Sequence, residues 1–168
     1  ARERDELGQR EDVGGCRMIK KKTGVMNMAI SRGGAVTDFN LDGLMDIAVV
    51  NRRTTAKVWR NLGTPELGTN AGRWVEFKLQ QPAPNRDGVG AWVEVRCDGA
   101  SVMRREMTVG GGHVSGNAGW THFGIGLTDK AEVRVVWPDG KTDEWQPLAP
   151  NTFYVLERGQ VPKVWAAK

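Results

Sequence analysis

The chain has 168 residues, 22 of them glycine and 7 tryptophan, and a formal net charge of +4 at pH 7. This length suits one or two small domains, and no apolar run reaches the roughly 18 residues of a membrane-spanning helix. The basic residues form no stripe and no aromatic-and-basic signature, so we expect no nucleic-acid partner.

Residues 1–30 mix charges of both signs with little periodicity, which predicts a flexible, solvated segment. A short helix over Arg2–Arg10 is an alternative, and Val25–Ile30 is a candidate strand. No signal peptide is visible, because the chain opens on a charged run. Cys16 and Cys97 match no zinc spacing. They either form one disulfide in an exported protein, or Cys97 is a small core residue and Cys16 lies in the N-terminal segment.

The stretch Asp38–Asp46 carries the most specific chemistry of the chain. Oxygen-bearing side chains fall at loop positions 1, 3, 5 and 9, and glycine stands at position 6; the predicted ligands are Asp38, Asn40, Asp42, the backbone carbonyl of Leu44, and Asp46. Calcium takes six to eight oxygen ligands, and a glycine allows the loop to turn sharply around the ion. An Asp-rich turn that binds nothing is the alternative, since these residues are common in turns.

This loop is not an EF-hand, because position 12 is Val49 rather than a bidentate glutamate. The β-branched run Ile47–Val50 predicts a buried strand directly after the loop. With its flanks Ser31–Thr37 and Val58–Asn61, the segment resembles the calcium loop of the FG-GAP or VCBS repeat of β-propeller blades. Residues 31–62 are therefore expected to form a short antiparallel, blade-like segment, with a second strand at Ala56–Asn61.

A Gly- and Pro-containing linker is predicted at residues 63–71, a β domain at 72–159 and a tail at 160–168. Alternating or short apolar runs predict about seven strands, which implies a β-sandwich or an open barrel. In one of them, Ala91, Val93 and Val95 share one face. Other strands are expected at Trp74–Leu79, Ser101–Val109, Trp120–Leu127, Glu132–Trp137, Lys141–Trp145 and Thr152–Glu157. Tight turns are predicted at Asp98-Gly99 and Pro138-Asp139-Gly140.

Several motifs in this region resemble the ASPIC/UnbV domain family. They are Asn85–Ala91, Gly111–Ser115, His122–Gly126, Val136–Gly140 and Pro150-Asn151. The resemblance implies an all-β domain that follows FG-GAP-type repeats in exported proteins, and it implies no established catalytic chemistry. The chain departs from this pattern because it holds one repeat where several are usual, and because its charge balance is basic.

No catalytic residue is predicted. His113 and Ser115 fail the nucleophile-elbow pattern, and His122 is expected to be a hydrogen-bonded structural residue. Arg86 and Asp87 either present themselves to a partner or pin their own loop. Flat aromatic faces at Trp92 and Trp120 could contact a protein or a sugar, although core packing is the simpler interpretation.

Together these features predict a non-enzymatic, calcium-binding β module of an extracellular or periplasmic protein, acting in protein interaction or scaffolding. The alternatives are a carbohydrate-binding module that uses exposed Trp faces, or the accessory C-terminal part of a larger propeller enzyme. The partner would be an unknown protein or glycan. Open strand edges also allow a homo-oligomer.

Overall fold

The computed structural model describes residues 12–13, 16–17, 30–63, 72–98, 102–113, 116 and 119–166. Every regular element in these ranges is a β-strand, so the predicted all-β class is confirmed. No helix in the described ranges combines the length and apolar character needed to cross a membrane. Two very short strands, β1 (Asp12–Val13) and β2 (Cys16–Arg17), pair antiparallel near the start of the chain.

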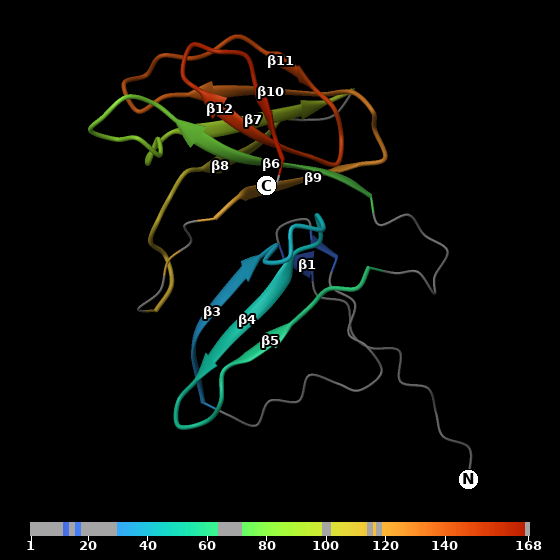
Figure 1. Ribbon diagram of the computed structural model, residues 1–168, viewed down its shortest axis with the longest axis vertical. Helices are drawn as coiled ribbons and strands as arrows, with labels where there is room; N and C mark the ends of the chain where they lie inside the picture. The colour runs from blue at the N-terminus through green and yellow to red at the C-terminus, as the bar shows by residue number, and fades with distance from the viewer. Residues whose placement is uncertain are drawn as a thin grey trace.

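Residues 72–166 form two stacked four-stranded sheets, which we call the sandwich (Figure 1). The docking sheet has the strand order β13-β12-β6-β9 and the distal sheet the order β11-β10-β7-β8. The docking-sheet strands are β6 (Arg73–Gln80), β9 (Thr121–Gly126), β12 (Thr152–Glu157) and β13 (Lys163–Trp165). The distal-sheet strands are β7 (Trp92–Cys97), β8 (Met103–Glu106), β10 (Ala131–Val136) and β11 (Gln146–Leu148). The sheets do not close into a barrel.

One apolar core fills the space between the two sheets. The docking sheet contributes Val75, Phe77, Leu79, Phe123, Ile125, Tyr154 and Leu156, and the distal side contributes Ala91, Val93, Val95, Ala131, Val133, Val135, Trp137 and Leu148. The predicted inward face Ala91/Val93/Val95 is confirmed, since all three side chains are fully buried. Burying one Val, Leu, Ile or Phe side chain stabilises a fold by about 1.5–3 kcal/mol, so this core is the main source of sandwich stability.

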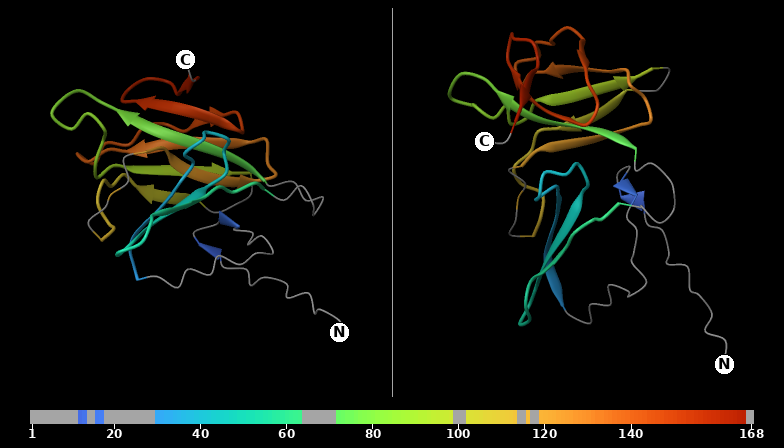
Figure 2. Two further views of the ribbon diagram at one scale, coloured as in Figure 1. Left: turned by 60° about the horizontal axis from the view of Figure 1, so that its bottom comes forward. Right: turned by 45° about the vertical axis from the view of Figure 1, so that its right-hand side comes forward.

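Residues 30–63 form a separate three-stranded antiparallel sheet, which we call the loop module. Its strands β3 (Ser31–Thr37), β4 (Asp46–Asn51) and β5 (Lys57–Trp59) are ordered β3-β4-β5. The turn between β3 and β4 points at the docking sheet, and the β4–β5 turn points away from it (Figures 1 and 2). The predicted metal loop therefore lies at the junction between the two parts.

Three predictions for strand and turn positions need correction or comment. The strand expected at Val25–Ile30 lies outside the described residues apart from Ile30, and the strand before the loop is Ser31–Thr37 instead. The strand expected at Lys141–Trp145 is wrong. That segment folds around the end of β10: the Asp143 N–H donates to the Val135 carbonyl, and Asp143 Oδ2 accepts from Trp137 Nε1 at 2.9 Å. Thr142 makes a single antiparallel bridge with Val136, and the continuous strand beside β10 begins only at Gln146. The Asp98-Gly99 turn lies partly outside the described residues.

The C-terminal boundary of the sandwich also differs from expectation. β13 lies inside the predicted tail and pairs antiparallel with β12, bringing Trp165 opposite Phe153. β12 runs parallel to β6, so the two ends of the sandwich sequence meet side by side in one sheet. Cys97 is a free, half-buried thiol packed against the core, and burial raises its pKa.

Candidate functional site

The β3–β4 loop is organised by its aspartates. Asp38 is 4 % exposed, and its carboxylate accepts the N–H groups of Asp42 at 3.1 Å and Gly43 at 2.6 Å. Asp46 is 1 % exposed and accepts the N–H groups of Phe39 at 3.3 Å and Asn61 at 2.7 Å. Asp and Asn stabilise turns by such side-chain-to-backbone bonds. The first and last predicted ligands therefore also hold the loop together.

Asp42 lies at the more open side of the loop. It accepts the Leu44 N–H at 3.0 Å, the Asn40 amide at 2.7 Å and the Arg60 guanidinium at 3.0 Å. Burial alone would raise the pKa of Asp42, but the hydrogen bonds from Asn40, Arg60 and Leu44 outweigh it and hold the pKa below its ordinary value. Asp42 is thus held as a carboxylate, the form that a hard cation requires.

The loop carries the oxygen donor types that a hard cation prefers. In the arrangement described, no three or more Asp, Glu, His or Cys side chains converge as a metal-binding group. Yet Asn40 Oδ1 is buried and lacks any hydrogen-bond partner in the structure, and Gly43 adopts φ +84°, which a sharp turn requires. A carboxylate has about four lone-pair sites, so Asp38 and Asp46 retain acceptor capacity beside their N–H bonds. In its donor types the set therefore fits a hard cation.

The docking sheet presents an unusual polar pair toward this loop. Glu76 on β6 is 1 % exposed and lies opposite His122 on β9, with Glu76 Oε1 3.1 Å from His122 Nδ1. The other oxygen, Oε2, is buried without a partner in the structure. Burial raises the pKa of Glu76, and the negative charge of Asp38 adds to this effect against the opposing influence of His122. The predicted structural role of His122 is confirmed, but its acid partner comes from 46 residues away.

Trp74 connects the pair to the loop. Its indole stacks on the His122 ring with centroids 6.4 Å apart, and its other contacts include Phe153 at 4.8 Å. Gly43 packs so closely on this indole that an added Cβ would overlap its ring atoms. Positions 1 and 6 of the predicted metal loop, Asp38 and Gly43, therefore face the sandwich rather than solvent.

Aromatic rings continue across the same face of the docking sheet. Trp120 contacts Phe153 and Trp165, each with centroids 5.0 Å apart, and the Lys78 ammonium lies 4.5 Å from the Trp120 ring. We call Trp74, Trp120, Phe153 and Trp165 the aromatic cluster. The outer face of a sandwich is usually polar, so this cluster indicates a face that receives another part of the protein.

Most of the sandwich matches a known protein family. Residues 81–163, from the end of β6 to the start of β13, match the profile of the family described as ASPIC and UnbV. The chain carries an ASPIC and UnbV domain. Cartilage acidic protein 1 of Mus musculus is 29 % identical to the chain over 131 residues, which is 74 % of this chain and 19 % of that relative. The chain thus spans about a fifth of the length of this curated relative.

The residues predicted as a partner surface are spread over the ASPIC and UnbV domain. Arg86 and Asp87 are exposed in the β6–β7 loop, whose shape is held by Asn85: its side chain bonds both the N–H and the carbonyl of Val89. Trp92 lies on the outer face of the distal sheet, whereas Trp120 lies on the docking sheet. The structure does not bring these four residues onto one surface.

The outer face of the distal sheet is an Arg–Glu–Trp network. The Arg104 guanidinium lies 4.1 Å from the Trp92 ring, and Arg96 and Arg134 lie 4.3 and 4.5 Å from the Trp145 ring. Arg134 also donates to Glu94 at 2.7 Å. Because cationic side chains cover these indoles, they offer less free face for a stacked sugar than the sequence suggested.

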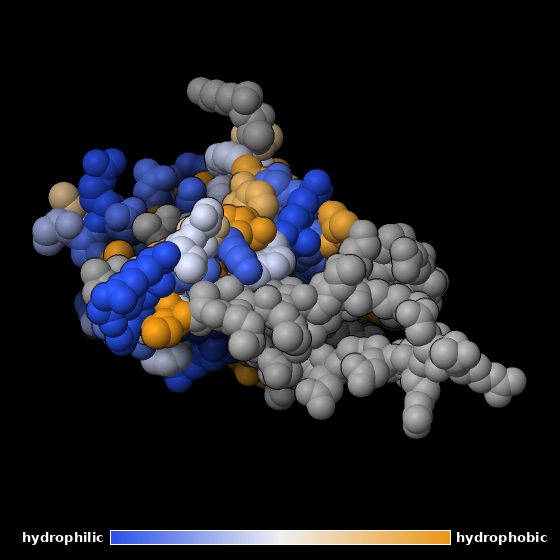
Figure 3. Space-filling model, turned by 90° about the horizontal axis from the view of Figure 1, so that it is seen from below, coloured by the Kyte–Doolittle hydropathy of each residue, from blue (hydrophilic) through white to orange (hydrophobic). Residues whose placement is uncertain are grey.

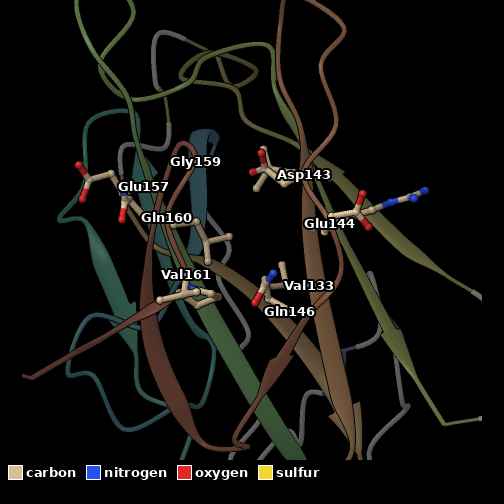
Figure 4. A pocket seen from close by; sticks show the side chains of 12 residues that line it. Val133, Asp143, Glu144, Gln146, Glu157, Gly159, Gln160 and Val161 are labelled. Carbon is tan, nitrogen blue, oxygen red and sulfur yellow. The ribbon is translucent and has the colours of Figure 1, made fainter.

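A cavity of about 250 Å³ opens on the side of the domain where β11 and β13 are short (Figure 4). Its lining includes the apolar side chains of Val133, Val135 and Leu156 and the polar side chains of Asp143 and Gln146. Asp143 is already bonded to the Trp137 indole, and Glu157 at the rim is paired with Lys163 at 2.5 Å. Two of its lining carboxylates are thus already paired, and sequence reasoning gave no signal for this cavity.

Proposed function

We propose that this chain is a calcium-binding β module that serves in protein interaction or scaffolding outside the cytoplasm, without catalysing a reaction. The observation that carries the proposal is the Asp38–Asp46 loop. It combines two nearly buried carboxylates, a third held ionised, and the unpartnered buried oxygen of Asn40. A divalent cation would neutralise the mutual repulsion of these groups and occupy their remaining acceptor sites.

Asp38, Asn40, Asp42, the Leu44 carbonyl and Asp46 would hold the ion, in the manner that FG-GAP-type loops suggest. The ion would supply structural cross-linking rather than chemistry. The similarity to cartilage acidic protein 1, a protein named for its occurrence in cartilage, supports an extracellular location. The aromatic cluster supports a role in contact with other protein parts.

The test is thermal unfolding of the full chain with excess calcium and with a chelator. Extracellular modules bind calcium with Kd near 10⁻⁴–10⁻³ M, so 10 mM calcium should stabilise the folded state by roughly 1.4–2.7 kcal/mol. For a chain of this size that corresponds to a rise in Tm of several degrees. Asp42→Ala should abolish the difference between the two conditions.

The matched control is Asp98→Ala, which removes an exposed aspartate at the end of β7 and should leave the calcium response intact. An equal Tm of the unsubstituted chain in calcium and in chelator would refute the proposal.

A further inference from the structure

We infer that cation binding at the β3–β4 loop and docking of the loop module on the sandwich are one coupled event, with Glu76 of the sandwich as the coupling carboxylate. The inference rests on the proposed calcium function and extends it across the module boundary. It makes the bound ion a determinant of how the two modules are held together.

The first support is a chain of contacts through the junction, whose two ends, Asp38 and Glu76, interact by charge. Asp38 accepts the Gly43 N–H at 2.6 Å, Gly43 packs on the Trp74 indole, and Trp74 stacks on His122. His122 bonds Glu76, and the charge of Glu76 interacts with that of Asp38. A movement of the Asp38 carboxylate toward an ion would therefore change the electrostatic environment of Glu76 directly, and its packing indirectly through Gly43, Trp74 and His122.

The second support is the unpartnered oxygen of Glu76. This side chain is 1 % exposed, and Oε2 has no hydrogen-bond donor within the described structure. An unsatisfied buried carboxylate oxygen is costly, and the charges of two nearly buried carboxylates that sense each other repel. A positive charge beside Asp38 would convert this repulsion into attraction for both groups.

The third support is that, among the residues the structure describes, the loop carboxylates have one cationic side-chain partner, Arg60. Arg60 pairs with Asp42 at the open side of the loop, and its side chain is half exposed. Asp38 and Asp46 are instead satisfied only by backbone N–H groups among the hydrogen bonds described. On the domain side, His122 is the group that bonds Glu76, and it reaches only Oε1. The described groups of the junction therefore carry negative charge that an added cation would offset.

The experiment measures calcium affinity of the full chain by titration calorimetry, using calcium chloride alone as the probe. Because Glu76→Gln removes the charge and keeps the shape, it should weaken calcium binding by about fivefold or more, the usual lower range for coupled sites. Glu132→Gln is the matched control. It removes a carboxylate paired with Arg96 on the outer face of the distal sheet, and it should leave the affinity within about twofold.

A second measurement needs no substitution. In hydrogen–deuterium exchange of the unsubstituted chain, calcium should slow exchange in the 38–46 loop and also in β6 and β9. Protection confined to the loop, or equal affinities of Glu76→Gln and the unsubstituted chain, would overturn the inference and leave the proposed calcium function standing. If the unsubstituted chain takes up no calcium, the proposed function fails, and this inference fails with it.

Discussion

The sandwich and the loop module are both antiparallel-rich β structures of short strands, but different forces hold them. The buried apolar side chains of the described chain all belong to the sandwich. In the loop module the buried side chains are polar: Asp38, Asp46 and Asn51. The sandwich is thus stabilised mainly by the hydrophobic effect, and the loop module by hydrogen bonds to its own backbone and by what it docks against.

The apolar residues of the loop module confirm this contrast. Val36, Val50 and Val58 are 38 %, 57 % and 60 % exposed. Viewed from the side of the loop module, apolar side chains stand among hydrophilic ones rather than forming one continuous surface (Figure 3). A three-stranded sheet that buries so little apolar area has marginal stability alone. The comparison therefore teaches that the loop module depends on its junction, whereas the sandwich depends on its own core.

The largest difference in stability between the two parts is expected when one core side chain of the sandwich is removed. Phe77 is fully buried and contacts the rings of Phe123 and Tyr154. Phe77→Ala should lower the free energy of unfolding of the sandwich by about 3–5 kcal/mol, through lost burial and a residual cavity. Denaturant unfolding followed by fluorescence measures this. Val58→Ala, an apolar truncation in the loop module, is the comparison variant and should cost less than about 0.5 kcal/mol. Equal costs would contradict the division of forces.

A smaller effect is expected at the junction itself. Gly43 adopts φ +84° and touches the Trp74 indole, so Gly43→Ala introduces backbone strain and steric overlap together. The free energy that favours the docked state should fall by about 1–3 kcal/mol, the usual cost of one strained residue. Faster hydrogen exchange of the loop, with the sandwich core unchanged, would register the undocking.

Gly110→Ala provides the control for Gly43→Ala, because a methyl group at Gly110 meets no atom within 4 Å. If Gly43→Ala leaves exchange of the loop as slow as Gly110→Ala does, the close approach of Gly43 to Trp74 is not what holds the modules together.

The sandwich was largely predictable because its signals are local. Alternation placed Ala91, Val93 and Val95 on the buried face, and Pro138-Asp139-Gly140 specified a turn that the Gly140 N–H closes onto the Trp137 carbonyl at 2.8 Å. The parallel pairing of β6 with β12 could not be predicted this way, because it joins segments 77 residues apart, as in Val75 beside Thr152. β13 was missed because three residues carry too little periodicity.

The candidate site was predictable only on its loop side. Oxygen-bearing residues at fixed spacing identified Asp38, Asn40, Asp42 and Asp46 as a set, and the structure places all four in one turn. The Glu76–His122 pair on the sandwich side could not be predicted, because the two residues meet only through the β6–β9 register. Long-range pairing of this kind leaves no mark in a single sequence, where Glu76 resembles an ordinary polar residue on an exposed strand face.

The smallest change in stability is expected at the Arg158–Asp139 pair. It checks that surface charge is not what stabilises the sandwich. Arg158 donates to Asp139 Oδ2 at 2.5 Å, and this hydrogen bond holds the pKa of Asp139 below its ordinary value. A lowered folded-state pKa means that the contribution is present above the ordinary pKa of aspartate and is lost as pH falls through the folded-state value.

Asp139→Asn should therefore make Tm depend less on pH between about pH 4 and pH 2. At neutral pH its change in Tm should be smaller than that of Phe77→Ala or Gly43→Ala. Asp87→Asn, at an exposed loop position, supplies the baseline for removing one surface carboxylate. Thermal melts of both variants across this pH range measure the difference. A loss at neutral pH as large as that of Phe77→Ala would mean that the sandwich relies on its rim charges as well as its core, and the contrast with the loop module would then rest on burial of polar groups alone.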